Sequence, residues 1–325
     1  MDVRSEKEFG EGHIPDALNI PILNNAERVA VGTDYKHKGQ LEAIKTGFRL
    51  VGPRIIDLVN EAERIAPARE MLVHCWRGGM RSSNFCHFVG MAKLRTHQLK
   101  GGYKAYRQKA LDSFKEPFQF IVLGGSTGSG KTDVLRALAE KGEQIIDLEK
   151  LASHKGSAFG GLMMPPQPTT EQFQNDLFEE ILRLDLSKKI WIEDESIAVG
   201  RIFLPDDLWR RMNASPVIEL NVEKNARIRR LVNEYGIADR LQFLASMEKI
   251  TKKLGGQHFK EAKQKLSEGA MDATIEILLN YYDKAYAIGL SKKQNRIQHR
   301  MPWDGVDANS CATQLLTTIG TTAFA

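Results

Sequence analysis

Short apolar runs recur along the chain, and segments with the spacing of amphipathic helices separate them. Between residues 53 and 70, for example, apolar residues recur at helical spacing from Ile55 to Ile65. Buried strands that alternate with helices are typical of parallel sheets covered by helices. The pattern therefore predicts an α/β protein up to about residue 221, and we expect only helices from residue 222 onward. The runs that predict strands are Met71–Val73, Phe118–Gly124, Ile145–Glu149, Ile190–Ile192 and Pro216–Leu220.

The composition is that of an ordinary globular protein. The chain has 325 residues, of which 42% are hydrophobic and 27% charged, which is enough for two domains and a helical extension. No apolar stretch is long enough to span a bilayer, and residues 1–6 lack the features of a signal peptide. We therefore expect a cytoplasmic protein without a membrane partner. Three cysteines are too few for a disulfide framework or a zinc site, so no metal is firmly predicted.

Positive charge is concentrated in one segment. Residues 221–300 carry 16 Lys and Arg against 9 Asp and Glu, whereas the charges of residues 1–220 balance. A basic excess confined to one region favours a polyanionic partner, most simply a nucleic acid. Charge alone fits a solvated helical surface equally well.

A cysteine loop over residues 71–83 is the first candidate for chemistry. The strand Met71–Val73 leads to Cys75 and a glycine-bearing turn, and a helix is expected from Ser82. Successive amides of such a loop form an anion cradle, and together with Arg81 they should lower the pKa of the thiol. Cys75 is therefore the predicted nucleophile. The predicted anion- or donor-binding residues are Arg77, Gly78, Gly79 and Arg81.

Other interpretations of this loop remain open. Its pattern also describes the loop of cysteine phosphatases, so it does not by itself choose between phosphate and chalcogen transfer. A buried structural cysteine beside a tight turn is the plain alternative. Cys86 follows on the expected helix and could be a resolving thiol, although a core position is the favoured interpretation.

A phosphate-binding loop is the second candidate. The strand Phe118–Gly124 runs into residues 125–132, which fit G-x-x-x-x-G-K-S/T, and a helical run follows. Consecutive acids follow the strand Ile190–Ile192, and of these Asp194 is our first choice for the carboxylate beside Mg²⁺ and Glu193 the second. These acids could instead cap the next helix. The predicted phosphate-binding residues are Gly125, Gly128, Gly130, Lys131 and Thr132, with Thr132 as a possible Mg²⁺ ligand.

The first 22 residues resemble the opening of a rhodanese domain. The matching segments are Asp2–Arg4, Glu8–Phe9 and Gly12–Pro21. This resemblance implies a rhodanese-like fold that includes the cysteine loop, and it disfavours the phosphatase, which would need a separate general acid. In that family the first strand starts before the position of Met1, so the N-terminal strand is expected to be truncated.

A rhodanese-like domain followed by a P-loop domain resembles the tRNA 2-selenouridine synthases. The segments Val31–Lys36, Leu151–Gly160 and Glu193–Ser196 add to the resemblance. It implies a selenotransferase that replaces sulfur of wobble 2-thiouridine in tRNA with selenium from selenophosphate. It also implies geranyltransferase activity, because an S-geranyl intermediate is made from geranyl diphosphate. The implied partners are tRNA and, transiently, a selenophosphate-supplying enzyme.

The combined prediction is an α/β chain in three regions. These are a rhodanese-like domain (1–112), a P-loop NTPase-like parallel-sheet domain (117–221) and a helical, basic region for tRNA contact (222–325). No tightly bound cofactor is expected, Mg²⁺ is possible, and the oligomeric state is open. One alternative is a cysteine phosphatase or arsenate-reductase-like enzyme fused to a kinase-like P-loop domain. Another is a non-catalytic RNA-binding regulator with a nucleotide switch.

Overall fold

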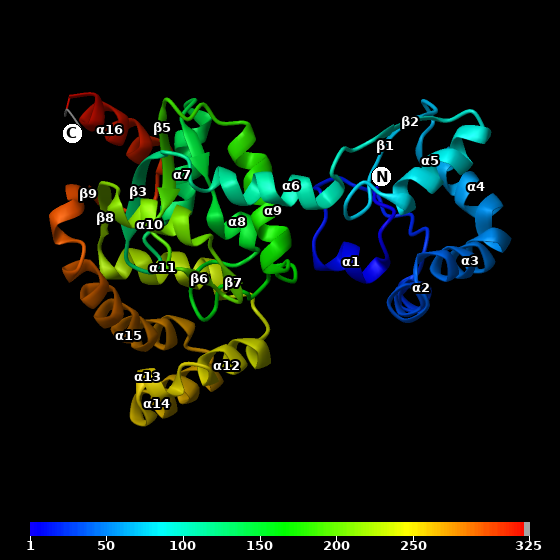
Figure 1. The fold of residues 1–325 in the computed structure, drawn as a ribbon. Helices are drawn as coiled ribbons and strands as arrows, with labels where there is room; N and C mark the ends of the chain where they lie inside the picture. Colours follow the sequence, from blue (N-terminus) through cyan, green and yellow to red (C-terminus); the bar gives the residue numbers. More distant parts are fainter. Residues whose placement is uncertain (322–325) are drawn as a thin grey trace. The chain divides into compact units, whose positions relative to one another are not determined.

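Two structural units make up the chain in the computed structural model, which describes residues 1–321 (Figure 1). The first unit contains Met1–Phe114 and Glu171–Glu179, the greater part of helix α9 (Thr170–Leu182). The second contains Lys115–Thr170 and the chain from Glu180 onward. Among the helices of residues 1–321, none combines the length and the apolar character that a bilayer-spanning segment needs.

The first unit places a small parallel sheet among helices. Strands β1 and β2 pair in parallel, with Val73 opposite Gln98. Asp2 forms parallel bridges to both Asn19 and His74, so the N-terminal segment lies beside the strand that leads to the cysteine loop. The elements are α1 (Glu6–Glu11), α2 (Asn25–Lys38), α3 (Gln40–Val51), the 3₁₀ turn η1 (Gly52–Arg54), α4 (Ile55–Ile65), β1 (Glu70–Val73), α5 (Met80–Met91), β2 (Arg95–Gln98) and α6 (Gly102–Ser113).

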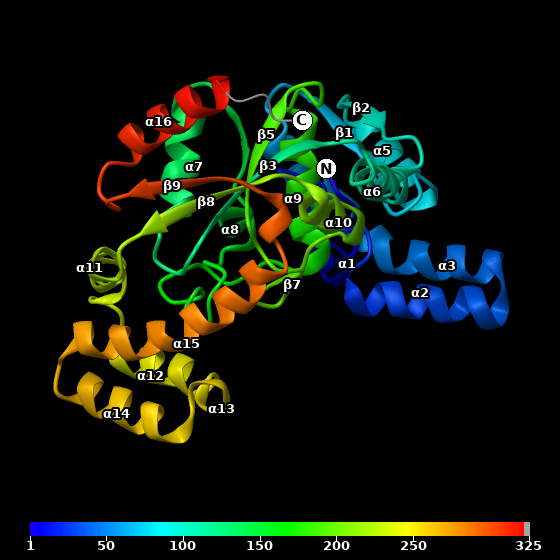
Figure 2. The ribbon, with the colours of Figure 1, turned by 90° about the vertical axis from the view of Figure 1, so that its left-hand side faces the viewer.

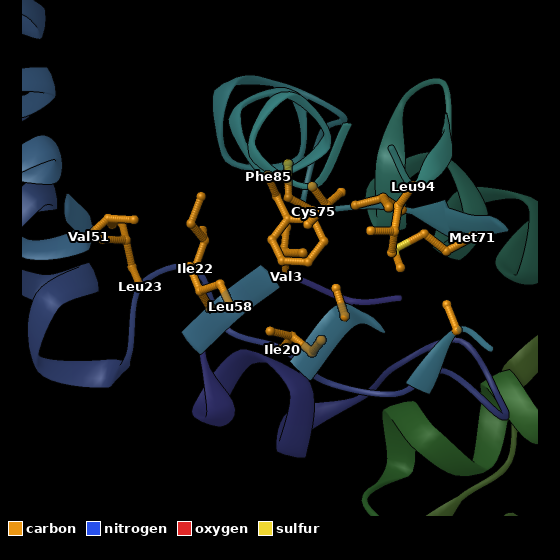
Figure 3. Close-up of a cluster of buried hydrophobic side chains, with 14 residues drawn as sticks. Val3, Ile20, Ile22, Leu23, Val51, Leu58, Met71, Cys75, Phe85 and Leu94 are labelled. Atoms are coloured by element: carbon orange, nitrogen blue, oxygen red, sulfur yellow. The ribbon is translucent and has the colours of Figure 1, made fainter. Parts of the chain in front are cut away.

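A buried cluster beneath the cysteine loop holds this unit together. Figure 3 shows Cys75 in the cluster with Val3, Phe85 and Leu58. Asp2 and Arg4 form an ion pair beside it, 2.6 Å long and almost fully buried. Good geometry and additional hydrogen bonds are needed to offset the cost of removing such an ion pair from water.

The guanidinium of Arg4 also organises the chain around it. It donates to the carbonyl oxygen of Gly12 at 2.7 Å and lies 3.8 Å above the ring of Tyr103. The Asp2–Arg4 motif that resembles a rhodanese opening is therefore structural, because it fixes the loop at Gly12 against helix α6.

Residues 25–51 form two helices, α2 and α3. Tyr35 and Lys36 lie within α2, and the Tyr35 side chain is 62% exposed. Asp34 accepts a hydrogen bond from Thr46 at 2.7 Å and so joins the two helices.

The second unit is built on a five-stranded parallel sheet with the order β4-β5-β3-β8-β9. Figure 2 shows α7 and α16 side by side on one face, where apolar residues from both helices pack on the sheet. The strands are β3 (Gln119–Gly125), β4 (Gln144–Ile146), β5 (Lys189–Glu193), β8 (Val217–Val222) and β9 (Ile297–Trp303), with a hairpin of β6 (Ala198–Val199) and β7 (Ile202–Phe203). The helices of the sheet region are α7 (Lys131–Glu140), α8 (Leu148–Ala152), α10 (Asp206–Ala214) and α16 (Ala308–Thr321).

Strand β9 corrects the prediction that the chain is only helical from residue 222 onward. It pairs in parallel with β8, with Met301 opposite Leu220, and forms an edge of the sheet. Polar and apolar residues are mixed in its sequence and only Met301 is buried, because an edge strand is only partly covered. The predicted boundary at 221/222 falls within β8, and residues from 222 onward belong to the second unit.

Between β8 and β9, five helices form a subdomain with its own apolar cluster. Phe159, from the segment before α9, packs into this cluster with Tyr235 and Phe243. The helices are α11 (Lys224–Tyr235), α12 (Arg240–Glu248), α13 (Thr251–Leu254), α14 (Gly256–Ser267) and α15 (Met271–Ser291). A short 3₁₀ turn η2 (Gln294–Arg296) then leads into β9.

Candidate active site

The thiol of Cys75 sits at the start of the loop between β1 and α5. The residue is 3% exposed, and its Sγ lies 3.2 Å from the hydroxyl of Ser82. Burial opposes ionisation of the thiol. Hydrogen bonds from the Ser82 hydroxyl and from the backbone amides of Ser82, Gly79 and Arg77 outweigh it, so the pKa of Cys75 is lowered. The thiol also lies 3.9 Å from the carbonyl oxygen of Gly79, to which it can donate when it is protonated.

Glycines let the backbone approach this loop closely. Gly78 has φ +65°, and a Cβ there would lie 2.7 Å from the carbonyl oxygen of Leu99. Gly102 has φ +59°, and its Cβ would lie 2.3 Å from the carbonyl oxygen of Cys75. The amide of Tyr103 then donates to that same oxygen at 2.9 Å. The start of α6 thus clamps the cysteine loop from behind.

Arg81 has a different neighbour from the expected one. Its guanidinium donates to the carboxylate of Glu8, with Nη1–Oε2 at 2.5 Å and Nη2–Oε1 at 3.1 Å. The lowered pKa of Cys75 is explained by Ser82 and the loop amides instead. Arg77 is exposed, and only its amide contacts the sulfur. The structure therefore gathers Gly78, Gly79 and the backbone around Cys75 and holds the Arg81 side chain on Glu8.

An apolar cavity of about 150 Å³ borders the same loop. Helices α2 and α3 supply most of its wall, including Tyr35 and Phe48, and Met80 and Arg81 close it from α5. The helices of residues 25–51 therefore create an apolar space beside the anion-binding loop.

Two other titratable side chains near the loop have structural roles. His74 is 2% exposed, and burial lowers its pKa to about 4, against the effect of Asp2 at 3.9 Å. The imidazole is neutral at physiological pH and brings no positive charge to the thiol. Burial raises the pKa of Cys86, which packs against the core of the unit as favoured from sequence.

The P-loop follows β3 and opens helix α7. Gly125, Gly128 and Gly130 all have positive φ, and α7 begins at Lys131. The Lys131 ammonium donates to the carbonyl oxygen of Gly125 at 3.2 Å. The loop faces a cavity of about 1500 Å³ that Lys131 and Thr132 line. This arrangement presents amides, an ammonium and a helix N-terminus to a phosphate.

Carboxylates meet the hydroxyl of Thr132 at the end of β5. The Oγ1 atom lies 2.7 Å from Glu193 and 2.9 Å from Glu149. Burial, followed by the charge of Glu149, raises the pKa of Glu193 well above its usual range. Asp194, the first choice from sequence, instead pairs with Lys293 at 2.5 Å. Glu193, the second choice, and Glu149 are thus the acids that the structure places at Thr132.

Oxygen ligands suit Mg²⁺, so Thr132 with Glu193 or Glu149 fits such an ion. Within residues 1–321, no group of three or more His, Cys, Asp or Glu side chains could hold a metal ion by itself. Phosphate oxygens and water would have to complete the coordination, as is usual for Mg²⁺ at a P-loop.

Sequence reasoning missed three polar residues at these sites. Ser82 contacts the sulfur of Cys75. Its position in the first turn of α5, at the end of the cysteine loop, could have indicated this contact. Glu149 was assigned to a strand end but lies in α8, facing Thr132. Glu195 lines the P-loop cavity. Burial raises its pKa to about 7, against the effect of Lys131, which allows proton exchange near neutral pH.

The fold and both sites define a class of protein. A parallel-sheet unit carrying an activated cysteine loop, joined to a P-loop unit, is a rhodanese-like domain fused to a P-loop domain. Residues 1–109 match the rhodanese-like domain family, and residues 118–314 match the tRNA 2-selenouridine synthase AAA domain.

Relatives that match over most of their length support the two domain matches. The chain is 34% identical to the tRNA 2-selenouridine synthase of a Sulfurovum species over 339 residues, covering 92% of this chain and 91% of the relative. It is 35% identical to the enzyme of the same description from Marinobacter nauticus over 333 residues, covering 91% and 89%. The chain belongs to the tRNA 2-selenouridine synthase family, whose members are tRNA-modifying transferases.

Proposed function

We propose that this chain replaces the sulfur of wobble 2-thiouridine in tRNA with selenium taken from selenophosphate. The observation that carries the proposal is the Cys75 loop, where a thiol of lowered pKa lies 3.2 Å from the Ser82 hydroxyl at the start of α5. Amides at a helix N-terminus bind tetrahedral oxyanions, which suits the phosphate part of the donor. Cys75 is then the thiolate that attacks the phosphorus of selenophosphate, so that an S–P bond forms as the P–Se bond breaks, and water later hydrolyses the S-phosphocysteine. The released selenide attacks C2 of the S-geranylated uridine and expels geranylthiol.

The P-loop cavity supports a second activity, the transfer of a geranyl group. In that step the 2-thio sulfur bonds to the first carbon of geranyl diphosphate, and the bond from that carbon to oxygen breaks to release pyrophosphate. Lys131 and the P-loop amides would hold the diphosphate. Mg²⁺ held by Thr132 and Glu193 would neutralise part of the negative charge of the diphosphate. Trp209, Leu231 and Leu290 line the same cavity and offer apolar contacts to the isoprenoid. A nucleoside triphosphate is the competing occupant.

The remaining partners follow from this chemistry. A tRNA substrate places the reaction in the cytoplasm, and the basic residues between 221 and 300 are the region we propose for tRNA contact. Selenophosphate must come from another enzyme, with which we propose a transient encounter.

Reconstitution with purified protein tests the proposal. The substrate is an anticodon stem-loop that contains 2-thiouridine, and nucleosides are analysed by mass spectrometry. Geranyl diphosphate alone should give the S-geranyl nucleoside, and adding selenophosphate should give 2-selenouridine. Lys131→Ala should lose both products, because the geranylated nucleoside precedes 2-selenouridine. Cys75→Ser should lose only 2-selenouridine, whereas Ser83→Ala should retain both. Absence of 2-selenouridine with the unmodified protein would refute the transfer. Hydrolysis of p-nitrophenyl phosphate that depends on Cys75 would favour a phosphatase instead.

A further inference from the structure

A second large cavity adjoins the P-loop cavity in the second unit. It has a volume of about 980 Å³, and Gly156, Ser157 and Tyr282 line both cavities. Its walls come from the segment after α8, from the β6–β7 hairpin and from helices α12, α13 and α15. Figure 2 shows these three helices close together. The residues that matter here are His154, Arg201, Lys249, Lys253, Tyr281 and Tyr282.

The charge of the lining has a single sign. Arg201, Lys249 and Lys253 contribute positive charge, and no residue that lines this cavity in the described part of the chain is acidic. By contrast, the P-loop cavity contains Glu149 and Glu195 beside its cations. Low-dielectric walls that carry only positive charge concentrate anions. The cavity is therefore suited to a ligand with more than one phosphate.

Two tyrosines provide a stacking surface within this basic cavity. Their ring centroids lie 5.0 Å apart on α15. Tyr282 is fixed, since its hydroxyl accepts from the amide of Ala158 at 3.2 Å and its ring packs near Phe159. Tyr281 is half-buried and lines the cavity. An aromatic ring beside cations is the usual platform for an unpaired base.

His154 offers polar atoms next to that platform. Burial, followed by the charge of Lys249, lowers its pKa, so the ring is neutral and presents one donor and one acceptor. The Nδ1 atom is buried and has no hydrogen-bond partner within residues 1–321. The backbone of Gly160 and Gly200 approaches the ring so closely that a Cβ at either would lie 2.8 Å from it. A neutral imidazole held in place in the cavity wall suits the edge of a base.

We propose that this cavity receives an unpaired nucleotide of the tRNA substrate, a subsite that rests on the proposed function. The base stacks on Tyr281 with its edge at His154, and the flanking phosphates contact Arg201, Lys249 and Lys253. A free mononucleotide shares this chemistry, but its phosphates would occupy the P-loop in the adjoining cavity. The three positive side chains of this cavity, Arg201, Lys249 and Lys253, come in addition to those at the P-loop. They suit an RNA strand with several phosphates better than they suit a single nucleotide.

Binding of a fluorescently labelled anticodon stem-loop to the full chain tests the proposal. The logarithm of the binding constant falls linearly with the logarithm of the salt concentration, by about 0.7 for each phosphate of a single strand that the protein contacts. The double variant Lys249→Ala/Lys253→Ala should therefore make this slope shallower by about 1.4. The matched control Lys141→Ala/Lys188→Ala removes the same charge from exposed positions outside residues 221–300 and outside the cavity, and should leave the slope unchanged.

The stacking contact has its own pair of variants. Tyr281→Ala should weaken RNA binding roughly tenfold or more, because one base–aromatic stack is lost, whereas Tyr281→Phe keeps the ring and should bind normally. Thermal unfolding of each variant confirms that it is folded.

Three results would overturn the proposal. One is an equal effect of the two lysine pairs, which would indicate only diffuse attraction to the basic surface. Another is wild-type RNA affinity in Tyr281→Ala. The third is loss of ATP binding with RNA binding intact in the cavity variants, which would assign the cavity to a free nucleotide. Because Cys75→Ser should still bind the RNA, a failure of selenium transfer and a failure of this subsite can be told apart.

Discussion

The reactivity of Cys75 depends on one hydroxyl and a set of backbone amides. Its sulfur is buried, which by itself would keep the thiol protonated. The amides of the loop and the first turn of α5 reverse that preference, and the Ser82 hydroxyl adds a hydrogen bond at 3.2 Å. Preorganised donors of this kind stabilise a thiolate without a neighbouring cation.

Replacing Ser82 should therefore change the ionisation of the thiol. We expect Ser82→Ala to raise the pKa of Cys75, because the largest interaction that favours the thiolate is lost. Ultraviolet absorbance of the thiolate as a function of pH measures the shift, with Cys75→Ser as the blank. Ser83→Ala, an exposed neighbour in the same turn, should leave the titration unchanged. An unchanged titration in Ser82→Ala would contradict this account.

His74 should make the stability of the protein depend on pH. Its pKa is about 4 in the folded chain and 6.5 in the unfolded chain, so only the unfolded state binds the proton between these values. The contribution is fully present above pH 6.5 and is lost as the pH falls toward 4. The free energy of unfolding should drop by about 3 kcal/mol over this window. Urea denaturation of the wild type and of His74→Asn measures the difference in slope, and identical slopes would show that His74 does not titrate this way.

At the scale of elements, the cysteine loop is shaped by the start of α6 as much as by α5. Gly102 brings the backbone of α6 against the carbonyl oxygen of Cys75, and the next two amides donate to Cys75 and Trp76. A side chain at Gly102 would both clash and strain the backbone.

We expect Gly102→Ala to destabilise the chain by about 1–3 kcal/mol or more and to lower selenium transfer, since the loop must move. Gly90→Ala is the matched control, because a Cβ there would meet no atom within 4 Å. That change should alter stability by less than about 1 kcal/mol. Denaturant unfolding and single-turnover transfer check both variants. Equal stability of the two would argue against the clamp.

Patterns that lie within one stretch of the chain could be predicted from the sequence. Cys75 with its glycines and the P-loop with Lys131 are each contiguous in the sequence, and the strands before them are mainly apolar. The contact of Arg81 with Glu8 joins residues 73 positions apart, and that of Thr132 with Glu149 depends on where α8 begins. Strand β9 was missed because its half-covered position at the sheet edge removes the apolar signal.

At the scale of the whole molecule, each unit carries its own core and its own candidate chemistry. The cluster around Cys75 belongs to the first unit, whereas the sheet cluster and the helical cluster belong to the second. A ligand at the P-loop should therefore stabilise the second unit.

Ligand-dependent unfolding tests that assignment. Geranyl diphosphate at a hundred times its Kd should add about 2.7 kcal/mol to the free energy of unfolding. Lys131→Ala should abolish the effect, because its ammonium and the P-loop hold the diphosphate, and Lys141→Ala, exposed at the end of α7, should preserve it. Differential scanning calorimetry with geranyl diphosphate and with ATP identifies the preferred ligand. Stabilisation that persists in Lys131→Ala would place the ligand elsewhere.

The most direct test is mass spectrometry of tRNA nucleosides from cells that lack the gene and carry a plasmid-borne copy. Our account predicts that the wild type and Ser83→Ala restore 2-selenouridine, whereas Cys75→Ser does not. The account would be contradicted if Cys75→Ser restored 2-selenouridine to the wild-type level. It would also be contradicted if the 2-selenouridine content of the tRNA did not depend on the gene.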